Sequence, residues 1–183
     1  TIAISISRDG SWSLPSMNQL PSGGVDPQQL PECLTAGGEP ASPALLQSLS
    51  DGPVVVMPLL HGPLGEDGTV QGLIELLNLP YVGSGVLSSA VAMDKAMAKA
   101  VFAHAGIPQV KYLALREDQV NTSALQEIEK VLGLPIFVKP ANMGSSVGVS
   151  KAHNSDELHA AARVATKYDQ WILFEECVDA REI

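Results

Sequence analysis

The chain has 183 residues, 45% of them hydrophobic, and a formal net charge of −9 at pH 7. This length allows one ordinary domain or two small ones, and the negative charge disfavours nucleic acid and anionic membranes as partners. No apolar run is long enough to span a membrane. The two cysteines, Cys33 and Cys177, form neither a disulfide framework nor a metal pattern, which is typical of reduced thiols in a cytoplasmic protein.

The first part of the chain contains one strand signal and a long connection. Isoleucines alternate over residues 1–7, which predicts a half-buried strand. Residues 11–52 are rich in Pro, Gly and Ser and have weak periodicity, so we expect an irregular connection with at most a short helix at residues 43–49. A connection of this length is unusual in a compact domain.

The next stretch has the pattern of a βαβ unit. Apolar periodicity predicts a buried parallel strand at residues 54–60, a helix at 69–77 and a short strand at 80–82. The loop between the first strand and the helix carries His61 and Glu66. Because ligands bind where strands of an open parallel sheet end in such loops, both residues are candidates for a site.

The second half alternates helices and strands, and ten of the eleven basic residues lie after residue 85. This asymmetry is expected if the second half binds an anion, although scattered surface lysines would also produce it. Lys95 and Lys99 lie one helical turn apart, a spacing that most often belongs to a solvated face. The predicted elements are a helix from Ser88 or Ser89 to Ala105, a strand at 110–115, a helix from Thr122 or Ser123 to Gly133, strands at 136–138 and 147–150, a helix at 154–167 and a strand at 171–175.

A loop of small residues joins the strands at 136–138 and 147–150. Pro140 favours an extended conformation for Lys139, so this lysine ends the first strand. Backbone N–H groups that are not shielded by large side chains follow it, at Gly144, Ser145, Ser146 and Gly148. Such groups, beside two hydroxyls and a lysine, suit a polyphosphate. The Walker and dinucleotide patterns do not fit, so the loop is either a flap over a nucleotide or a plain hairpin turn.

Three segments resemble the D-alanine–D-alanine ligase family. Residues 61–72 read HGPLGEDGTVQG and look like that family's first signature, and residues 81–95, YVGSGVLSSAVAMDK, resemble the segment that follows it. Residues 137–151 read FVKPANMGSSVGVSK and are similar to the family's ATP-grasp flap. The resemblance is strong over residues 54–183 and weak before them.

The resemblance implies an α/β fold. Residues 1–87 would form a Rossmann-like domain, incomplete at its start, and residues 88–183 the small α+β subdomain of an ATP-grasp fold. The family's N-terminal Gly-rich loop has no counterpart in the sequence, nor has its C-terminal domain, which supplies the Mg²⁺ ligands, an arginine and a closing loop. Because phosphoryl transfer depends on positioning and metal charge, we expect an incomplete chain without ligase turnover of its own.

The resemblance implies a ligase that joins two D-alanines to give D-alanyl-D-alanine for peptidoglycan. ATP would phosphorylate the carboxylate of one D-alanine, and the amine of a second would attack the acyl phosphate. The resemblance further implies ATP and Mg²⁺ as cofactors, a homodimer and a cytoplasmic location. Two alternatives remain open: a D-alanine–D-lactate or D-alanine–D-serine ligase, and a catalytically inactive nucleotide-binding module.

The resemblance also assigns roles in nucleotide binding to single residues. Lys95 and Lys139 match lysines that contact the ATP phosphates as point charges. The flap over the phosphates is matched by Gly144, Ser145, Ser146 and Val147. The adenosine contacts are matched by Glu175 at the adenine amino group, by Glu176 and Val178 at the base and by Glu182 at the ribose.

The resemblance also implies roles on the substrate side for Ser145, His61 and Glu66, which are the catalytic candidates. Each of the last two has a structural rival. A buried histidine that only holds its loop would explain His61, and a carboxylate that charges a helix N-terminus would explain Glu66.

Overall fold

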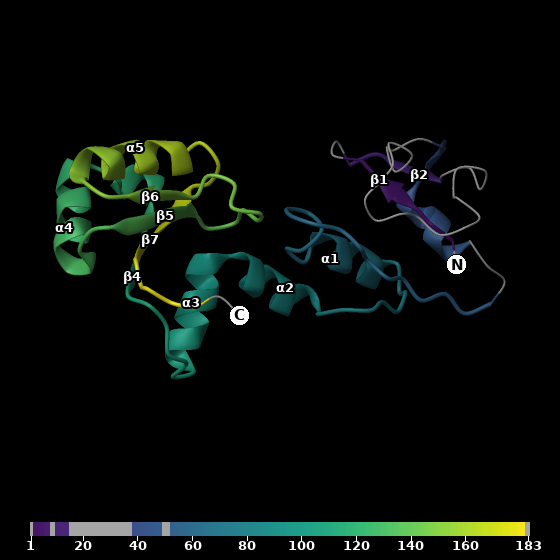
Figure 1. Cartoon of the computed structure of the whole chain (residues 1–183). Coiled ribbons are helices and arrows are strands. Elements are labelled where there is room, and N and C mark those ends of the chain that lie inside the picture. Colours follow the sequence, from purple (N-terminus) through teal and green to yellow (C-terminus); the bar gives the residue numbers. More distant parts are fainter. Residues whose placement is uncertain (1, 8–9, 15–37, 49–51, 182–183) are drawn as a thin grey trace. The chain divides into compact units, whose positions relative to one another are not determined.

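The computed structural model describes residues 2–7, 10–14, 38–48 and 52–181. The chain divides into two compact units, namely Thr1–Val56 with Glu75–Pro80, and Met57–Ile74 with Tyr81–Ile183. Figure 1 shows the chain coloured along its sequence. None of the helices within the described ranges has the length and the apolar character needed to cross a bilayer.

The first unit contains a small antiparallel sheet of three strands in sequence order, β1 (Ser5–Ile6), β2 (Trp12–Leu14) and β3 (Glu39–Ala41). The 3-10 helix η3 (Pro43–Gln47) follows, which confirms the short helix expected there. The strand expected over residues 1–7 is shorter than predicted. β2 and β3 lie in the segment expected to be irregular, because their pairing is a contact between distant residues that local periodicity does not report.

The apolar run at residues 54–60 was predicted as a buried parallel strand, and this prediction is wrong. Its one bridge residue is Val56, whose N–H donates to the Pro80 carbonyl at 2.9 Å. Three of its side chains are 62%, 63% and 76% exposed, those of Val55, Met57 and Leu59. Exposed and half-buried residues alternate, so the run is an extended segment with one covered face. Of the predicted βαβ unit, the helix α1 (Thr69–Leu76) is confirmed, and the strand at 80–82 is reduced to one bridge residue, Tyr81.

The second unit contains a four-stranded antiparallel sheet (Figure 1). Its strands lie in the order β4 (Tyr112–Arg116), β7 (Trp171–Glu176), β5 (Ile136–Pro140) and β6 (Ser150–Ala152). The helix α4 (Thr122–Leu132) joins β4 to β5, and α5 (Ser155–Ala165) joins β6 to β7. These elements confirm the predicted order of helices and strands, with shifted ends.

One face of this sheet carries the hydrophobic core. Ile172 and Phe174 of β7, together with Ile136 and Val138 of β5, pack there against apolar side chains of α4 and α5. Because side chains alternate along a strand, the neighbouring residues point to the opposite face. That face therefore carries Tyr112, Phe137, Lys139, Leu173 and Glu175.

The single helix predicted between residues 88 and 105 is in fact two helices, α2 (Val86–Met93) and α3 (Lys95–His104). Asp94 separates them, because its Oδ1 accepts two backbone N–H groups from the first turn of α3, both at 2.9 Å. An aspartate that can bond such groups favours a helix cap over a helix interior. The break gives α3 a start of its own, with Lys95 as its first residue.

Candidate nucleotide and substrate site

Two lysines from different elements meet one glutamate on the open face of the sheet. Lys139 of β5 donates to Oε2 of Glu175, and Nζ of Lys99 on α3 lies 2.7 Å from Oε1. The side chain of Glu175 is only 9% exposed. Burial by itself would raise the pKa of Glu175, but the hydrogen bonds and charges of the two lysines hold it below its usual value. Glu175 is therefore an ionised carboxylate with one lysine bonded to each of its two oxygens.

Aromatic rings stand on both sides of Glu175. Strand register places Tyr112 opposite Glu175 on β4 and Phe137 opposite it on β5, so the three side chains form one row across the sheet. Nζ of Lys99 lies 4.9 Å from the ring centroid of Tyr112, and Nζ of Lys139 lies 5.6 Å from that of Phe137. The row offers flat apolar surfaces beside a charged acceptor, a combination that suits a planar heterocycle with a donor group.

Lys95 reaches from the start of α3 to the beginning of the loop between β5 and β6. Its backbone N–H and its Nζ each donate to the Ala141 carbonyl at 3.1 Å, and Nζ also donates to the Met143 carbonyl. Burial and, next, the positive charge of nearby Lys139 lower the pKa of Lys95. Two ammonium groups that repel each other in a partly buried place would be stabilised by an anion between them.

The loop at residues 141–149 keeps donors available at its tip, and is called the flap from here on. Ser145 and Ser146 have φ angles of 49° and 61°, and both are exposed. The N–H groups of Val147 and Val149 are bonded within the flap. At the tip, the N–H groups of Gly144, Ser145, Ser146 and Gly148 have no hydrogen-bond acceptor within the described residues.

The base of the flap is fixed to the rest of the unit by two aspartates. The N–H of Asn142 donates to Asp169 Oδ2 at 2.6 Å, and its side-chain amide donates to Asp94 Oδ2 at 3.3 Å. Asp169 also accepts the N–H of Trp171 at 3.0 Å. The cap of α3 and the start of the flap are thus one hydrogen-bonded assembly. Sequence reasoning missed both aspartates, although the place of Asp94 directly before Lys95 is a signal for a helix cap.

In the loop that carries His61 and Glu66, neither residue has the purely structural role that was its alternative interpretation. Glu66 accepts the N–H of Gly62 and so closes its own loop. Asp67, rather than Glu66, is bonded to the start of α1, because it accepts the N–H of Thr69 at 3.0 Å. Partial burial opposes ionisation of Asp67, yet hydrogen bonds from backbone groups lower its pKa below the usual value. His61 is exposed, so the interpretation as a buried histidine is wrong.

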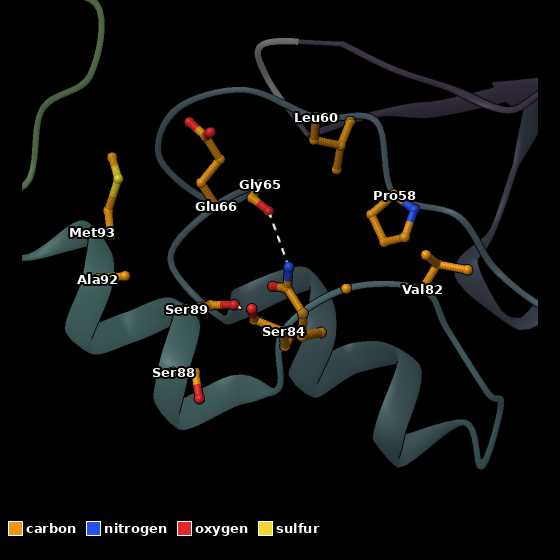
Figure 2. A pocket seen from close by; sticks show the side chains of 12 residues that line it. Pro58, Leu60, Gly65, Glu66, Val82, Ser84, Ser88, Ser89, Ala92 and Met93 are labelled. Carbon is orange, nitrogen blue, oxygen red and sulfur yellow. Dashed lines mark hydrogen bonds between the residues drawn. The ribbon is translucent and has the colours of Figure 1, made fainter. Parts of the chain in front are cut away.

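A cavity of about 380 Å³ lies between this loop and α2. Figure 2 shows Ser88, Ser89, Ala92 and Met93 along α2, with Glu66 and Leu60 on the loop across from them. Gln71 also lines the cavity, and its Nε2 donates to the Gly65 carbonyl at 3.3 Å. Its Oε1 is buried without a hydrogen-bond partner among the described residues. His61 does not line this cavity.

The residues assigned to the adenosine end are only partly described. The Glu176 carboxylate accepts the N–H of Lys111 at 2.7 Å, and Val178, two residues after β7, is 49% exposed. Glu182 lies outside the described residues. The described parts of the chain contain no group of three or more His, Cys, Asp or Glu residues that could hold a metal ion. The Mg²⁺ site, whose ligands the resemblance places in the family's C-terminal domain, stays a prediction.

Family models of two consecutive domains match the chain. The one described as D-ala D-ala ligase N-terminus matches residues 1–84, and the one described as D-ala D-ala ligase C-terminus matches residues 101–183. A D-alanine–D-alanine ligase of Listeria monocytogenes is 50% identical over 194 residues, which cover 98% of this chain and 52% of that protein. One of Bacillus velezensis is 59% identical over 132 residues, which cover 70% of this chain and 37% of that protein.

Solved structures of D-alanine–D-alanine ligases are also similar to the chain. A D-alanine–D-alanine ligase from Coxiella burnetii matches with a TM-score of 0.80 and 32% identity, over 97% of this chain and 54% of that one. A D-alanyl-alanine synthetase A from Vibrio cholerae matches with a TM-score of 0.64 and 34% identity, over 68% of this chain and 38% of that one. The likeness confirms the expected α/β fold class. The chain spans about half the length of these relatives, or less, and the domain boundary expected at residue 87 stays a prediction.

Proposed function

The chain belongs to the D-alanine–D-alanine ligase family, and we propose that it binds ATP and D-alanine for the ATP-dependent joining of two D-alanines. One observation carries this proposal. Lys95 donates to two carbonyls at the base of the flap, and the charge of Lys139 lowers its pKa, while the N–H groups of the exposed Ser145 and Ser146 have no acceptor among the described residues. Cations together with N–H donors that have no acceptor favour the binding of a phosphate chain.

Each part of the site has a role in this proposal. Lys95 and Lys139 balance the charge of the transferring phosphoryl group, and the flap N–H groups bind its oxygens. Glu175 accepts a hydrogen bond from the amino group of the base, between the rings of Tyr112 and Phe137. The cavity beside Glu66 takes the first D-alanine, whose carboxylate attacks the γ-phosphorus while ADP leaves. The amine of the second D-alanine then attacks the carbonyl carbon of the acyl phosphate. The peptide bond forms as the bond to phosphate breaks and phosphate leaves.

The metal ion, the oligomeric state, the location and the second substrate are proposed from the family resemblance. Mg²⁺ would supply further charge neutralisation at the phosphates in the ligation reaction. The homodimer and the cytoplasmic location also rest on the family resemblance. Lactate or serine as the second substrate is not favoured by any observation in the described residues, so D-alanine remains the proposed acceptor.

The nucleotide part of the proposal is tested by ATP titration of the chain and its Lys139→Met and Lys95→Met variants. Loss of a charged hydrogen bond to phosphate should weaken ATP binding by about 1.5–3 kcal/mol in each variant. This corresponds to a dissociation constant roughly 10- to 150-fold higher. Isothermal titration calorimetry measures the change directly.

Lys130→Met is the matched control, because Lys130 is 78% exposed on α4 and has only a 3.7 Å contact to Glu127. It should bind ATP like the wild type. A wild-type chain that binds no ATP, or lysine variants that bind it equally well, would contradict the proposal. Any D-alanine-dependent phosphate release should likewise disappear in Lys139→Met.

A further inference from the structure

Lys99 is a lysine of the site for which the family resemblance gives no role. It is only 14% exposed, and its Nζ lies 2.7 Å from Oε1 of Glu175 and 4.9 Å from the Tyr112 ring centroid. Its backbone carbonyl accepts the side-chain amide of Gln109 at 2.8 Å. Both the side chain and the helical turn that carries it are therefore held in place. A solvated lysine, as the spacing on α3 suggested, would have none of these contacts.

The two oxygens of Glu175 are bonded to two different lysines, of which only Lys139 is proposed to contact phosphate. Oε2 is bonded to Lys139 and Oε1 to Lys99. If Lys139 turns towards a bound phosphate, Oε2 loses its partner and can accept a donor group from the ligand. Oε1 keeps Lys99, which lies on a different element and is also held over Tyr112. The exchange of partners at one oxygen therefore leaves the other oxygen fixed.

We propose that Lys99 is a positioning residue of the nucleotide site, which holds Oε1 of Glu175 so that Oε2 remains an ionised acceptor for an exocyclic amino group on the bound base. This inference rests on the proposed function. Without Lys99, a carboxylate that is only 9% exposed would lose its remaining cation when Lys139 moves. Burial would then favour protonation, and a protonated Oε2 would donate rather than accept.

The other charged groups around Glu175 are bonded elsewhere or lie further away. Lys151 of β6 shares the row of Glu175, but Phe137 of β5 stands between them, and Nζ of Lys151 lies 5.5 Å from the ring centroid of Phe137. Lys95, also on α3, is bonded to the carbonyls of Ala141 and Met143. From β4 the neighbour is the ring of Tyr112, and from β5 it is Lys139 itself. On β7 the next residue is Glu176, another carboxylate, which is bonded to the backbone of Lys111. The charge balance of Glu175 thus depends on Lys99 once Lys139 is engaged.

The test compares ATP with inosine triphosphate, which carries an oxygen in place of the exocyclic amino group. Lys99→Met should reduce the preference for ATP over inosine triphosphate by about tenfold. Lys99→Arg, which keeps the charge, should restore most of it. A carbon-13 NMR titration of the Glu175 carboxyl should show a higher pKa in Lys99→Met. Because this group binds ATP only when ionised, ATP affinity of the variant should fall as the pH is lowered from 7 towards about 5.

The outcomes separate this inference from the proposed function. If the wild type binds ATP but Lys99→Met leaves both the base preference and the Glu175 titration unchanged, the inference fails alone. Equal weakening of both nucleotides would also overturn it, because a merely structural role predicts that result. If the wild type binds neither nucleotide, the proposed function fails as well. Should Lys99→Met not fold, Lys99→Gln retains a donor without charge and must show the same loss of preference. Lys130→Met serves as the control for loss of a surface charge.

Discussion

Single residues in this chain take their roles from partners that are distant in the sequence. The spacing of Lys95 and Lys99 indicates that they share a helix face, but it does not indicate which surface that face meets. The structure turns this face towards β7 and the flap, so the alternative interpretation as a solvated face does not hold. Glu66 and His61 also depart from their rival interpretations. The contacts of Lys95 and Lys139 with phosphate stay predictions.

Two glycines of the flap differ in how much space a side chain would have. Gly148 has a φ of +72°, and an added Cβ would lie 2.8 Å from Tyr168 and 2.9 Å from Pro140. An added Cβ at Gly144 would have no neighbour within 4 Å. We therefore expect Gly148→Ala to lower the free energy of unfolding by at least about 1–2 kcal/mol, the cost of a left-handed conformation alone. Urea denaturation measures this change.

Gly144→Ala is the matched control for that substitution. It should change the free energy of unfolding by no more than about 0.5 kcal/mol. Equal effects of the two substitutions would show that the contacts of Gly148 with Pro140 and Tyr168 do not constrain the flap.

At the scale of elements, the order of helices and strands in the second unit follows from local patterns. α4 ends at Gly133 and Asn154 caps α5, as the sequence indicates, whereas the cap of α4 is Asn121, one residue before the predicted start. Asp94 is the exception, because its side chain interrupts a stretch whose periodicity is continuous. Asp94 also links α3 to the flap. Its Oδ1 caps α3, and its Oδ2 accepts the side-chain amide of Asn142.

Removal of this connection should affect both stability and ligand binding. Asp94→Ala removes a helix cap, which should lower the free energy of unfolding by about 1 kcal/mol. It also releases Asn142 and the turn that begins with Lys95, so we expect weaker ATP binding in calorimetric titrations. Asn154→Ala removes a cap of the same kind from α5, where Asn154 accepts the N–H of Glu157 at 2.9 Å. It should cost about the same stability and leave ATP binding unchanged. Equal ATP affinities of the two variants would contradict the connection.

At the scale of the whole molecule, buried apolar surface is distributed unequally. Among the described residues of the first unit, Leu46 is the one buried apolar side chain, and all the others belong to the second unit. Because burial of apolar surface is the main favourable contribution to folding, the second unit should hold most of the stability. The chain spans about half the length of the relatives that it matches over nearly its whole length.

Hydrogen exchange can measure this inequality. Amides of β5 and β7 should exchange only through global unfolding of the second unit, because both strands are paired on each side within the sheet. Amides of β1 to β3 should exchange much faster. Mass spectrometry of peptides from the two units, taken from one exchange experiment, makes the comparison internal. Similar protection in both units would contradict the expected difference in stability.

The sequence by itself determined the α/β class, the family, the order of elements in the second unit and the flap with its lysine. These features depend on local propensity and on spacing along the chain, which a sequence displays directly. Only the tertiary structure decided that residues 54–60 leave one face exposed, that Asp94 breaks a helix, and that Lys99 bonds Glu175. The physical reason is that burial, capping and ion pairing depend on which surfaces meet. A local pattern records the face of an element but not its neighbour.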